Sequence, residues 1–254
     1  MAGKCTGCKD GTAFPVAIRT AFQPVIDLET GKPYAYEALV RGPNGEGAGS
    51  VLAEVTPENR YAFDQACRVA AIREAVFAGI LDTGASLSIN FLPNAVYSPM
   101  ACIQLTLQTA RETGFPLDRL IFEFTENERI EPDHLGSIID AYREIGFRTA
   151  IDDFGAGHAG LALLANLKTD IIKLDMELIR GIDTSLPRRI IVAGVLRLAR
   201  ELDLKVVAEG VETGAELNAL SEAGVQYVQG YLFAKPALGR LPALEHKVAT
   251  ALAA

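Results

Sequence analysis

The sequence predicts a closed α/β barrel, and two patterns lead to this prediction. Strand-like and helix-like segments alternate without a linker, and a polar residue stands at or near the C-terminal end of each apolar strand. The alternation favours a parallel sheet with helical crossovers, and a barrel gathers its strand ends around one opening. An open sheet would spread these polar residues along a line and leave buried carboxylates unpaired, which is costly. A length of 254 residues suits one such barrel.

The first structured segment is expected to be a β-hairpin. Residues 21–41 form two extended runs on either side of Glu29-Thr-Gly-Lys32, a sequence typical of a turn. The second run places Glu37, Leu39 and Arg41 on one strand face. An acid and a base on one face are most often a surface ion pair, so this spacing alone does not indicate a functional site.

The remaining elements follow from periodicity and stop signals. After a glycine-rich loop at residues 42–49, residues 61–79 show apolar positions at helical spacing and end at a glycine, whereas residues 86–90 alternate as a strand does. Further strands are expected at residues 120–126, 149–155, 170–175, 204–209 and 225–229. Further helices are expected at residues 100–113, 133–145, 161–167, 188–202, 214–223 and 241–252.

Composition excludes several classes of function. The net charge is −8 and the isoelectric point is near 5.0, which disfavours broad attraction to nucleic-acid polymers or anionic membranes. No apolar run is long enough for membrane insertion, and the first residues lack the apolar core of a signal peptide. Four cysteines do not make a disulfide framework in a chain of this length, which agrees with a reducing compartment. We therefore expect a cytoplasmic protein.

The first residues are expected to lie outside the barrel. Cys5 and Cys8 form a single Cys-x-x-Cys pair with no second pair to complete a metal site. Chain termini are commonly untidy, so we expect a flexible N-terminal arm at residues 1–18 and one barrel domain at residues 19–254.

The polar strand ends have the composition of a metal site. Asp152 and Asp153 are adjacent acids that repel each other unless a cation lies between them, which favours a metal site, although an acidic strand-to-loop turn explains this pair alone equally well. With the other strand ends they give five carboxylates and one amide, contributed by Glu37, Asn90, Glu123, Asp152, Asp153 and Glu209. Oxygen ligands without histidine or cysteine favour Mg²⁺ or Mn²⁺ over zinc, and the excess of acids favours two ions, as in phosphodiester hydrolysis.

Lys173 is the one base among these acids. It could be a structural counter-charge, or it could orient an attacking water and neutralise a phosphoryl oxygen.

These motifs, taken in order, resemble those of the EAL-domain phosphodiesterases of bacterial cyclic di-GMP signalling. The resemblance extends from about Phe22 to Pro236. The motifs are Glu37-Ala-Leu39 with Arg41, Asn90, Glu123-Phe-Thr-Glu126, Asp152-Asp-Phe-Gly155, Lys173-Leu-Asp175, Glu209-Gly-Val-Glu212 and Gln229-Gly-Tyr-Leu-Phe-Ala-Lys-Pro236.

The resemblance implies a modified TIM (β/α)8 barrel whose N-terminal hairpin contributes an antiparallel first strand. It implies hydrolysis of cyclic di-GMP to linear pGpG with Mg²⁺ or Mn²⁺, inhibition by Ca²⁺ and a homodimer. The implied metal ligands are Glu37, Asn90, Glu123, Asp152 as the bridge, Asp153 and Glu209, the last directly or through water. Lys173 would position the attacking water, and Gln229 would lie close to it. Gln23, Leu39 and Arg41 would hold the dinucleotide, and Glu126 would anchor the loop after Asp153, which couples the site to the dimer interface.

One loop departs from the pattern of the family. The usual sequence after the paired aspartates and Phe-Gly is Thr-Gly-Tyr-Ser-Ser, whereas here Gly155-Ala-Gly-His-Ala-Gly160 loses the hydroxyls. The loss affects loop rigidity, and with it the rate or the dimer coupling, more than the metal ligands. No sensor domain is recognised in this sequence, so an upstream regulatory partner is expected.

Two other functions compete with this interpretation. Gly155-x-Gly157-x-x-Gly160 matches the fingerprint of a dinucleotide-cofactor site, but a pyrophosphate beside Asp152 and Asp153 would meet two uncompensated charges. The stronger alternative is a non-catalytic cyclic di-GMP receptor or protein-interaction module on the same fold. Such family members typically lack metal carboxylates, and here every position is filled, which favours catalysis.

Overall fold

The computed structural model describes residues 12–125, 131–157 and 160–244. The strands are β1 (Arg19–Asp27), β2 (Lys32–Arg41), β3 (Ser86–Asn90), β4 (Leu120–Thr125), β5 (Arg148–Phe154), β6 (Ile171–Leu174), β7 (Lys205–Ala208), β8 (Tyr227–Gln229) and β9 (Ala237–Leu238). The α-helices are α2 (Ala48–Leu52), α3 (Arg60–Phe77), α4 (Ile80–Thr83), α5 (Pro99–Cys102), α6 (Gln104–Thr113), α7 (Pro132–Ile145), α8 (Gly160–Asn166), α9 (Met176–Ile179), α10 (Leu186–Glu201) and α11 (Gly214–Ala223). Two 3₁₀ turns, η1 (Pro93–Ala95) and η2 (Leu117–Arg119), complete the elements.

Strands β1 to β8 close into a barrel. From β2 to β8 each strand pairs in parallel with the next, and β1 closes the ring by pairing antiparallel with both β2 and β8. β9 pairs with β1 beside the ring and extends its edge. This arrangement confirms the predicted barrel and its antiparallel first strand, and its closed order excludes the open sheet that a dinucleotide-cofactor fold requires.

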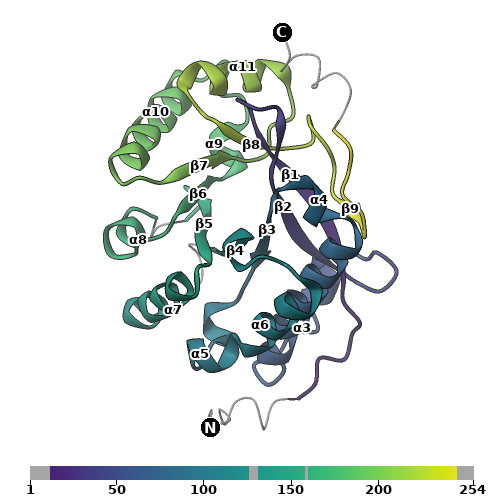
Figure 1. Ribbon diagram of the computed structural model, residues 1–254. Coiled ribbons are helices and arrows are strands. Elements are labelled where there is room, and N and C mark those ends of the chain that lie inside the picture. The colour runs from purple at the N-terminus through teal and green to yellow at the C-terminus, as the bar shows by residue number, and fades with distance from the viewer. Residues whose placement is uncertain (1–11, 126–130, 158–159, 245–254) are drawn as a thin grey trace.

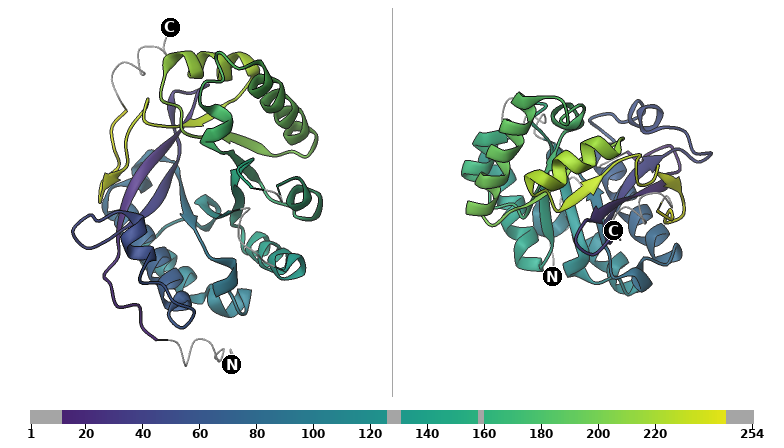
Figure 2. Two further views of the ribbon diagram at one scale, coloured as in Figure 1. Left: turned by 180° about the vertical axis from the view of Figure 1, so that it is seen from behind. Right: turned by 90° about the horizontal axis from the view of Figure 1, so that it is seen from above.

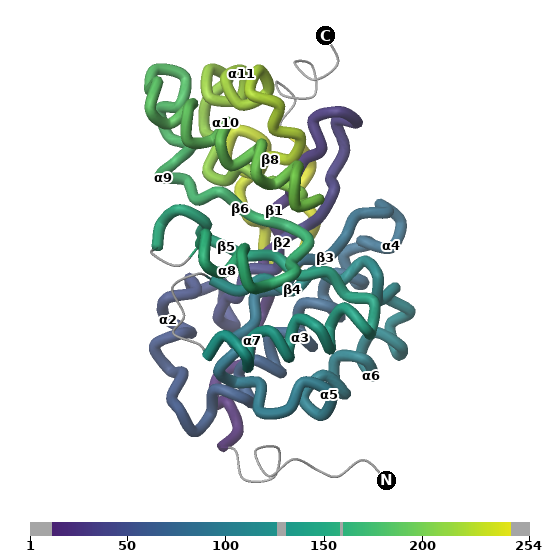
Figure 3. The backbone as a smooth tube through the Cα atoms, turned by 90° about the vertical axis from the view of Figure 1, so that its left-hand side faces the viewer, coloured from purple at the N-terminus to yellow at the C-terminus, as the bar shows by residue number. Residues whose placement is uncertain are grey.

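The longer helices surround the strands on the outside (Figure 1). Helices α3, α5, α6 and α7 lie together on one side of the barrel, and α10 and α11 lie together on the other, as Figures 1 and 3 agree. Figure 2 shows the same ring of helices from behind and from above. No helix within the described residues is long and apolar enough to cross a membrane.

The side chains of each strand alternate between two cores. In β4, Leu120, Phe122 and Phe124 face outward and pack in the large cluster between barrel and helices, whereas Ile121 belongs to a second cluster inside the barrel. This alternation is the two-residue period of a β-strand. The inner cluster takes one residue from each of seven strands, namely Val25, Ala35, Ile121, Ala150, Ile171, Val207 and Tyr227.

The structure confirms most predicted elements and corrects two. The helix expected at residues 100–113 is divided at Ile103 into α5 and α6. The helix expected at residues 241–252 is wrong at its start, because residues 241–244 are not helical, and the rest lies outside the described residues. Cys5, Cys8 and Glu126 also lie outside them, so the expectations for these residues are untested.

Short elements that the sequence did not reveal are α2, α4, α9, β9 and the two 3₁₀ turns. Each has at most five residues, which is too short for hydrophobic periodicity to register. Cys67 and Cys102 lie in helices α3 and α5, and Cys102 is buried.

Candidate active site

A polar layer lies next to the inner apolar cluster of the barrel. Two positions after Ile121 comes Glu123, and the same offset on the same strand face leads from Ile171 to Lys173. Strands β2, β5, β7 and β8 repeat this offset, and in the antiparallel β1 the polar residue precedes the apolar one. The polar layer defined in this way consists of Gln23, Glu37, Glu123, Asp152, Lys173, Glu209 and Gln229.

Lys173 is the centre of this layer. Its Nζ lies 2.7 Å from Glu209 Oε1, 3.0 Å from both Glu123 Oε2 and Asp152 Oδ1, and 3.4 Å from Glu37 Oε2. The lysine is 1% exposed, so these carboxylates replace water as its partners. Glu37 therefore pairs with Lys173 inside the barrel, and the interpretation of Glu37 and Arg41 as a surface ion pair is wrong.

The two adjacent aspartates both reach the opening because β5 is irregular at this point. The pairing of β5 with β6 shifts register between Ile151 and Phe154, and Asp153 has a left-handed φ of +54°. In a regular strand, neighbouring side chains point to opposite faces, so this irregularity re-aims one of the two carboxylates. Oxygens of Asp152, Asp153 and Glu209 lie within 4.8 Å of one another.

Two amides orient the Glu37 carboxylate. Asn90 Nδ2 donates to Glu37 Oε1 at 3.0 Å, and Gln229 Nε2 donates to Glu37 Oε2 at 2.8 Å. Gln229 Nε2 also lies 3.3 Å from Gln23 Oε1, and Gln23 Nε2 donates to the carbonyl of Ala234 at 3.2 Å. These hydrogen bonds connect β1 and β8, the first and the last strand of the barrel, to each other and to Glu37.

A glycine after Gln229 allows the backbone to pass closely. A Cβ on Gly230 would lie 2.0 Å from the carbonyl oxygen of Val211, and Val211 N–H donates to the carbonyl of Gln229 at 3.1 Å. Any larger residue would push apart the segments that follow Glu209 and Gln229.

The crowded acids have raised proton affinities. Burial raises the pKa of Glu123 to about 8, with Glu37 and Asp152 adding to the rise and Lys173 opposing it. Burial and the neighbouring Asp152 and Asp175 raise the pKa of Asp153 to about 6. Burial also raises the pKa of Glu209 well above its ordinary value.

The pKa of Lys173 is raised as well, but here the neighbouring carboxylates cause the rise and burial opposes it. Burial alone would lower the pKa of Lys173, but the facing carboxylates, Asp152 and Glu123 foremost, outweigh burial and raise it well above its ordinary value. The lysine is therefore charged. Its one positive charge faces five carboxylates, four in the polar layer and the fifth on Asp153.

The donor set fits divalent cations. Two groups of acids have ligand oxygens within 4.8 Å of one another, Glu37 with Glu123 and Asp152, and Asp152 with Asp153 and Glu209. Asp152 belongs to both groups. Its buried Oδ1 is in the ion pair with Lys173 but accepts no directed hydrogen bond, which leaves an acceptor for a further partner. Carboxylate oxygens in this arrangement suit a hard divalent cation.

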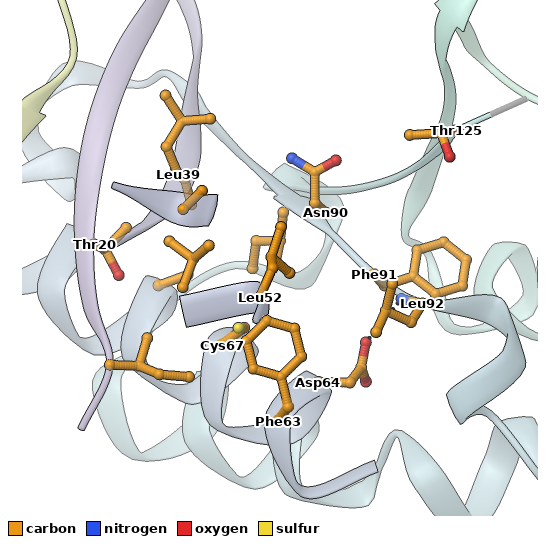
Figure 4. A pocket seen from close by; sticks show the side chains of 16 residues that line it. Thr20, Leu39, Leu52, Phe63, Asp64, Cys67, Asn90, Phe91, Leu92 and Thr125 are labelled. Atoms are coloured by element: carbon orange, nitrogen blue, oxygen red, sulfur yellow. Dashed lines mark hydrogen bonds between the residues drawn. The ribbon is translucent and has the colours of Figure 1, made fainter. Parts of the chain in front are cut away.

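Not every predicted residue joins the polar layer. Arg41 Nη1 donates to the carbonyl of its neighbour Val40 at 2.7 Å, and Arg41 is half-buried at the end of β2. Leu39 lines a cavity of about 280 Å³ beside the polar layer, together with Asn90. Figure 4 shows Leu39 and Asn90 across this cavity from Phe63, Asp64 and Cys67. Glu126 lies outside the described residues.

One neighbour of the polar layer was missed from the sequence. Ser88 is 1% exposed, and its hydroxyl donates to Glu123 Oε1. Serine is common in loops and strands alike, so its type gave no signal. Its position, two residues before Asn90 on the same strand face, was the available clue.

Comparison with known proteins identifies the family. The family model described as the EAL domain matches residues 17–236. A structure titled as a standalone versatile EAL protein from Vibrio cholerae O395 in a c-di-GMP bound form is 46% identical, with a TM-score of 0.88, over 92% of this chain and 98% of that one.

Two curated relatives from Escherichia coli K12 carry different names. The probable cyclic di-GMP phosphodiesterase PdeN is 31% identical over 85% of this chain and 43% of its own length. The blue light- and temperature-regulated antirepressor BluF is 31% identical over 88% of this chain and 55% of its own length. The chain thus spans about half the length of these curated relatives. The match to the EAL model over most of the sequence shows that the chain belongs to the EAL domain family.

Proposed function

We propose that this chain is a metal-dependent phosphodiesterase that hydrolyses cyclic di-GMP to linear pGpG. The observation that carries the proposal is the buried cluster of carboxylates in which Asp152 belongs to two groups with metal-ligand spacing. The name of PdeN and the c-di-GMP bound form of the Vibrio cholerae protein support the choice of substrate.

The residues that would hold two Mg²⁺ or Mn²⁺ ions are Glu37, Asn90, Glu123, Asp152, Asp153 and Glu209. Two such ions, when bound, supply Lewis-acid activation of water and stabilise charge on the phosphodiester. Ca²⁺ takes more ligands at longer distances, so we expect it to bind without supporting turnover.

The chain's own residues then act on water and phosphate. Lys173 is charged and rigidly held by Glu123, Asp152 and Glu209, so it can donate a hydrogen bond to the attacking water or to a phosphoryl oxygen. Glu209 has a high proton affinity, so it can hold a proton that the water releases. Glu37 is fixed by Asn90 and Gln229, so we assign it a catalytic role along with Lys173 and Glu209.

The substrate would lie across the opening of the barrel. We assign Gln23, Leu39, Arg41 and Gln229 to substrate binding. Leu39 lines the apolar cavity next to Asn90, which suits one face of a nucleobase, and Gln23 and Gln229 present amides beside Glu37. Arg41 would turn from the Val40 carbonyl to a phosphate, since guanidinium groups match phosphate geometry.

A homodimer is part of this proposal. Helix α10 exposes Leu186 and Ile190, both 63% exposed, and Ile191, which is 48% exposed. Ile191 also lines a surface pocket with Gly155, the residue that begins the loop after Asp153. An apolar face that shares a surface pocket with this loop suits a subunit interface coupled to the site, with Glu126 as the loop anchor.

Three further assignments complete the proposal. Residues 1–18 form an arm and residues 19–254 the phosphodiesterase domain. The protein acts in the cytoplasm, where an upstream partner regulates it.

The second candidate is a cyclic di-GMP receptor or protein-interaction module on the same fold. The antirepressor name of BluF favours this candidate, since that relative is similar over 88% of this chain. The experiment is incubation of the purified chain with cyclic di-GMP in Mn²⁺, Mg²⁺, Ca²⁺ or chelator, with binding and products measured in each. Appearance of pGpG with Mn²⁺ or Mg²⁺, and not with Ca²⁺ or chelator, supports the enzyme. Binding without product in every condition supports the receptor. Absence of both binding and product contradicts the enzyme and the receptor and leaves the protein-interaction module.

A further inference from the structure

Helix α3 carries a buried ion pair that lies outside the polar layer. Asp64 is 2% exposed and Arg68 is 0% exposed, and Arg68 Nη2 lies 2.8 Å from Asp64 Oδ2. The two residues are one helical turn apart. A buried ion pair contributes little to stability compared with apolar residues of similar size, so its geometry is more informative than its presence.

The pair holds the chain segment that follows Asn90. The backbone N–H of Leu92 donates to Asp64 Oδ1 at 3.0 Å, and the guanidinium of Arg68 lies 5.5 Å from the ring centre of Phe91. Figure 4 shows Asp64 beside Phe91 and Leu92 at the edge of the cavity. Both residues after Asn90 therefore contact the ion pair of α3.

Arg68 is itself held in place. Its Nη1 donates to the hydroxyl of Tyr142 at 2.8 Å, and its guanidinium lies 5.2 Å from the ring centre of Phe122. Tyr142 belongs to α7 and Phe122 to β4, so two elements besides α3 fix the guanidinium. A fixed guanidinium in turn fixes the carboxylate of Asp64.

Asn90 depends on this support because it ends its strand. On one side the pairing of β3 with β4 sets its backbone, with Asn90 opposite Glu123. Asn90 is exposed at the rim, so packing does not fix its side chain, whose amide donates to Glu37 Oε1 at 3.0 Å. On the other side, Phe91 N–H still donates to the carbonyl of Glu123 at 2.9 Å, and the bond from Leu92 to Asp64 then ties the backbone to helix α3.

We propose that Asp64, oriented by Arg68, is a positioning residue that sets Asn90 for its divalent ion. This inference rests on the proposed function, because it takes Asn90 as a metal ligand. Asp64 belongs to neither group of acids with metal-ligand spacing, although it lines the same cavity as Leu39, and its effect on Asn90 passes through Leu92 and the backbone. Loss of the acceptor at residue 64 is therefore expected to weaken metal binding even where the fold is retained.

Two matched double variants isolate the acceptor. Asp64→Leu with Arg68→Met removes both charges and the acceptor for the Leu92 N–H. Asp64→Asn with Arg68→Met removes the same charges but keeps an oxygen that can accept from Leu92 N–H. Asparagine and leucine are similar in size, so the two proteins differ mainly in this hydrogen bond. Glu74→Gln is the control on the same helix, because Glu74 accepts the N–H of Thr20 and pairs with Arg19 instead.

The measurement is calorimetric titration of the substrate-free proteins with Mn²⁺, alongside thermal unfolding in chelator. We expect the leucine double variant to bind Mn²⁺ at least about tenfold more weakly than wild type, the size of effect typical for residues that orient metal ligands. The asparagine double variant and Glu74→Gln should bind as wild type does. In the Asn90→Ala background, the leucine double substitution should cause no further loss of Mn²⁺ affinity, because the ligand that Asp64 positions is already absent.

Three outcomes overturn the inference. In the first, wild type and the leucine double variant bind Mn²⁺ with equal affinity. In the second, both double variants bind Mn²⁺ equally weakly. In the third, the leucine double substitution weakens Mn²⁺ binding further in the Asn90→Ala background. If the leucine double variant does not fold, Asp64→Ala with Arg68→Met provides the same comparison. A wild-type chain that binds no Mn²⁺ contradicts the proposed function itself, which separates the two failures.

Discussion

Asp153 follows Asp152 directly along β5, yet an oxygen of each lies within 4.8 Å of the other and of Glu209. The left-handed backbone at Asp153, with φ of +54°, makes this possible. For a non-glycine residue this conformation destabilises the fold by about 1 kcal/mol or more, and backbone strain of this kind is common at functional sites. Burial, and after it the neighbouring Asp152, raise the pKa of Asp153 to about 6, so the charged carboxylate carries a second cost. A divalent cation between the two carboxylates would offset both costs.

The first prediction concerns Asp152, the acid shared by both groups. Asp152→Asn should lower the number of Mn²⁺ ions bound per chain and reduce turnover at least about a hundredfold, the range expected when one group that stabilises a transition state is lost. Asp140→Asn is the control, since the Asp140 side chain is 72% exposed on α7. Metal analysis after dialysis and a product assay make the test. Unchanged stoichiometry with full turnover would disprove the shared role.

The second prediction concerns the charge of Lys173. In chelator, Lys173→Met leaves buried carboxylates without their cation, which should lower the free energy of unfolding by about 3 kcal/mol. Mg²⁺ should then raise the melting temperature of the variant more than that of wild type. Lys205→Met, at the start of β7 and exposed, is the matched control. Equal melting temperatures of wild type and Lys173→Met in chelator would contradict the prediction.

The third prediction concerns pH in the absence of metal. The pKa of Glu123 rises from an ordinary 4.5 to about 8 in the folded protein, so between these values the folded state holds a proton that the unfolded state releases. Stability is therefore lost as pH rises through this range, by up to about 1.4 kcal/mol per pH unit for one proton.

Urea unfolding in chelator at several pH values between these limits measures the effect. Saturating Mg²⁺ should stabilise the protein more at the upper limit than at the lower one, because it replaces the proton. Glu123→Gln should flatten the slope. A metal-free stability that is constant or rises over this range would contradict the prediction.

The fourth prediction concerns the exposed face of α10. Ile190→Glu places a charge on a side chain that is 63% exposed beside Leu186, so it should convert a dimer to a monomer in light scattering. Leu105→Glu, on an apolar residue of α6 that is 43% exposed, should leave the dimer intact. A wild-type chain that is monomeric at every concentration tested would contradict the proposed homodimer.

Much of the site could be predicted because a strand has a two-residue period. Glu123 stands two positions after Ile121 and Lys173 two positions after Ile171, so a barrel brings both side chains inward at one level. The sequence shows these offsets directly. The resemblance then added roles for residues whose types alone are ambiguous, such as Asn90.

The support around the site could not be predicted in the same way. Arg68 donates to Tyr142, which is 74 positions along the chain, and neither residue belongs to a recognisable motif. The register shift at Asp152 and Asp153 depends on the pairing of β5 with β6, which local sequence does not encode. Such contacts arise from tertiary packing, and only coordinates reveal them.

The most direct test of the account is the rate of pGpG release from cyclic di-GMP by wild type and Glu37→Ala in saturating Mn²⁺, with melting temperatures recorded for both. The Glu37 carboxylate accepts hydrogen bonds from Asn90 and Gln229 and pairs with Lys173, so its loss removes a metal ligand at the centre of the cluster. We predict metal-dependent hydrolysis by wild type and none by the folded variant. Near-normal turnover by Glu37→Ala, or none by metal-loaded wild type, would contradict the account.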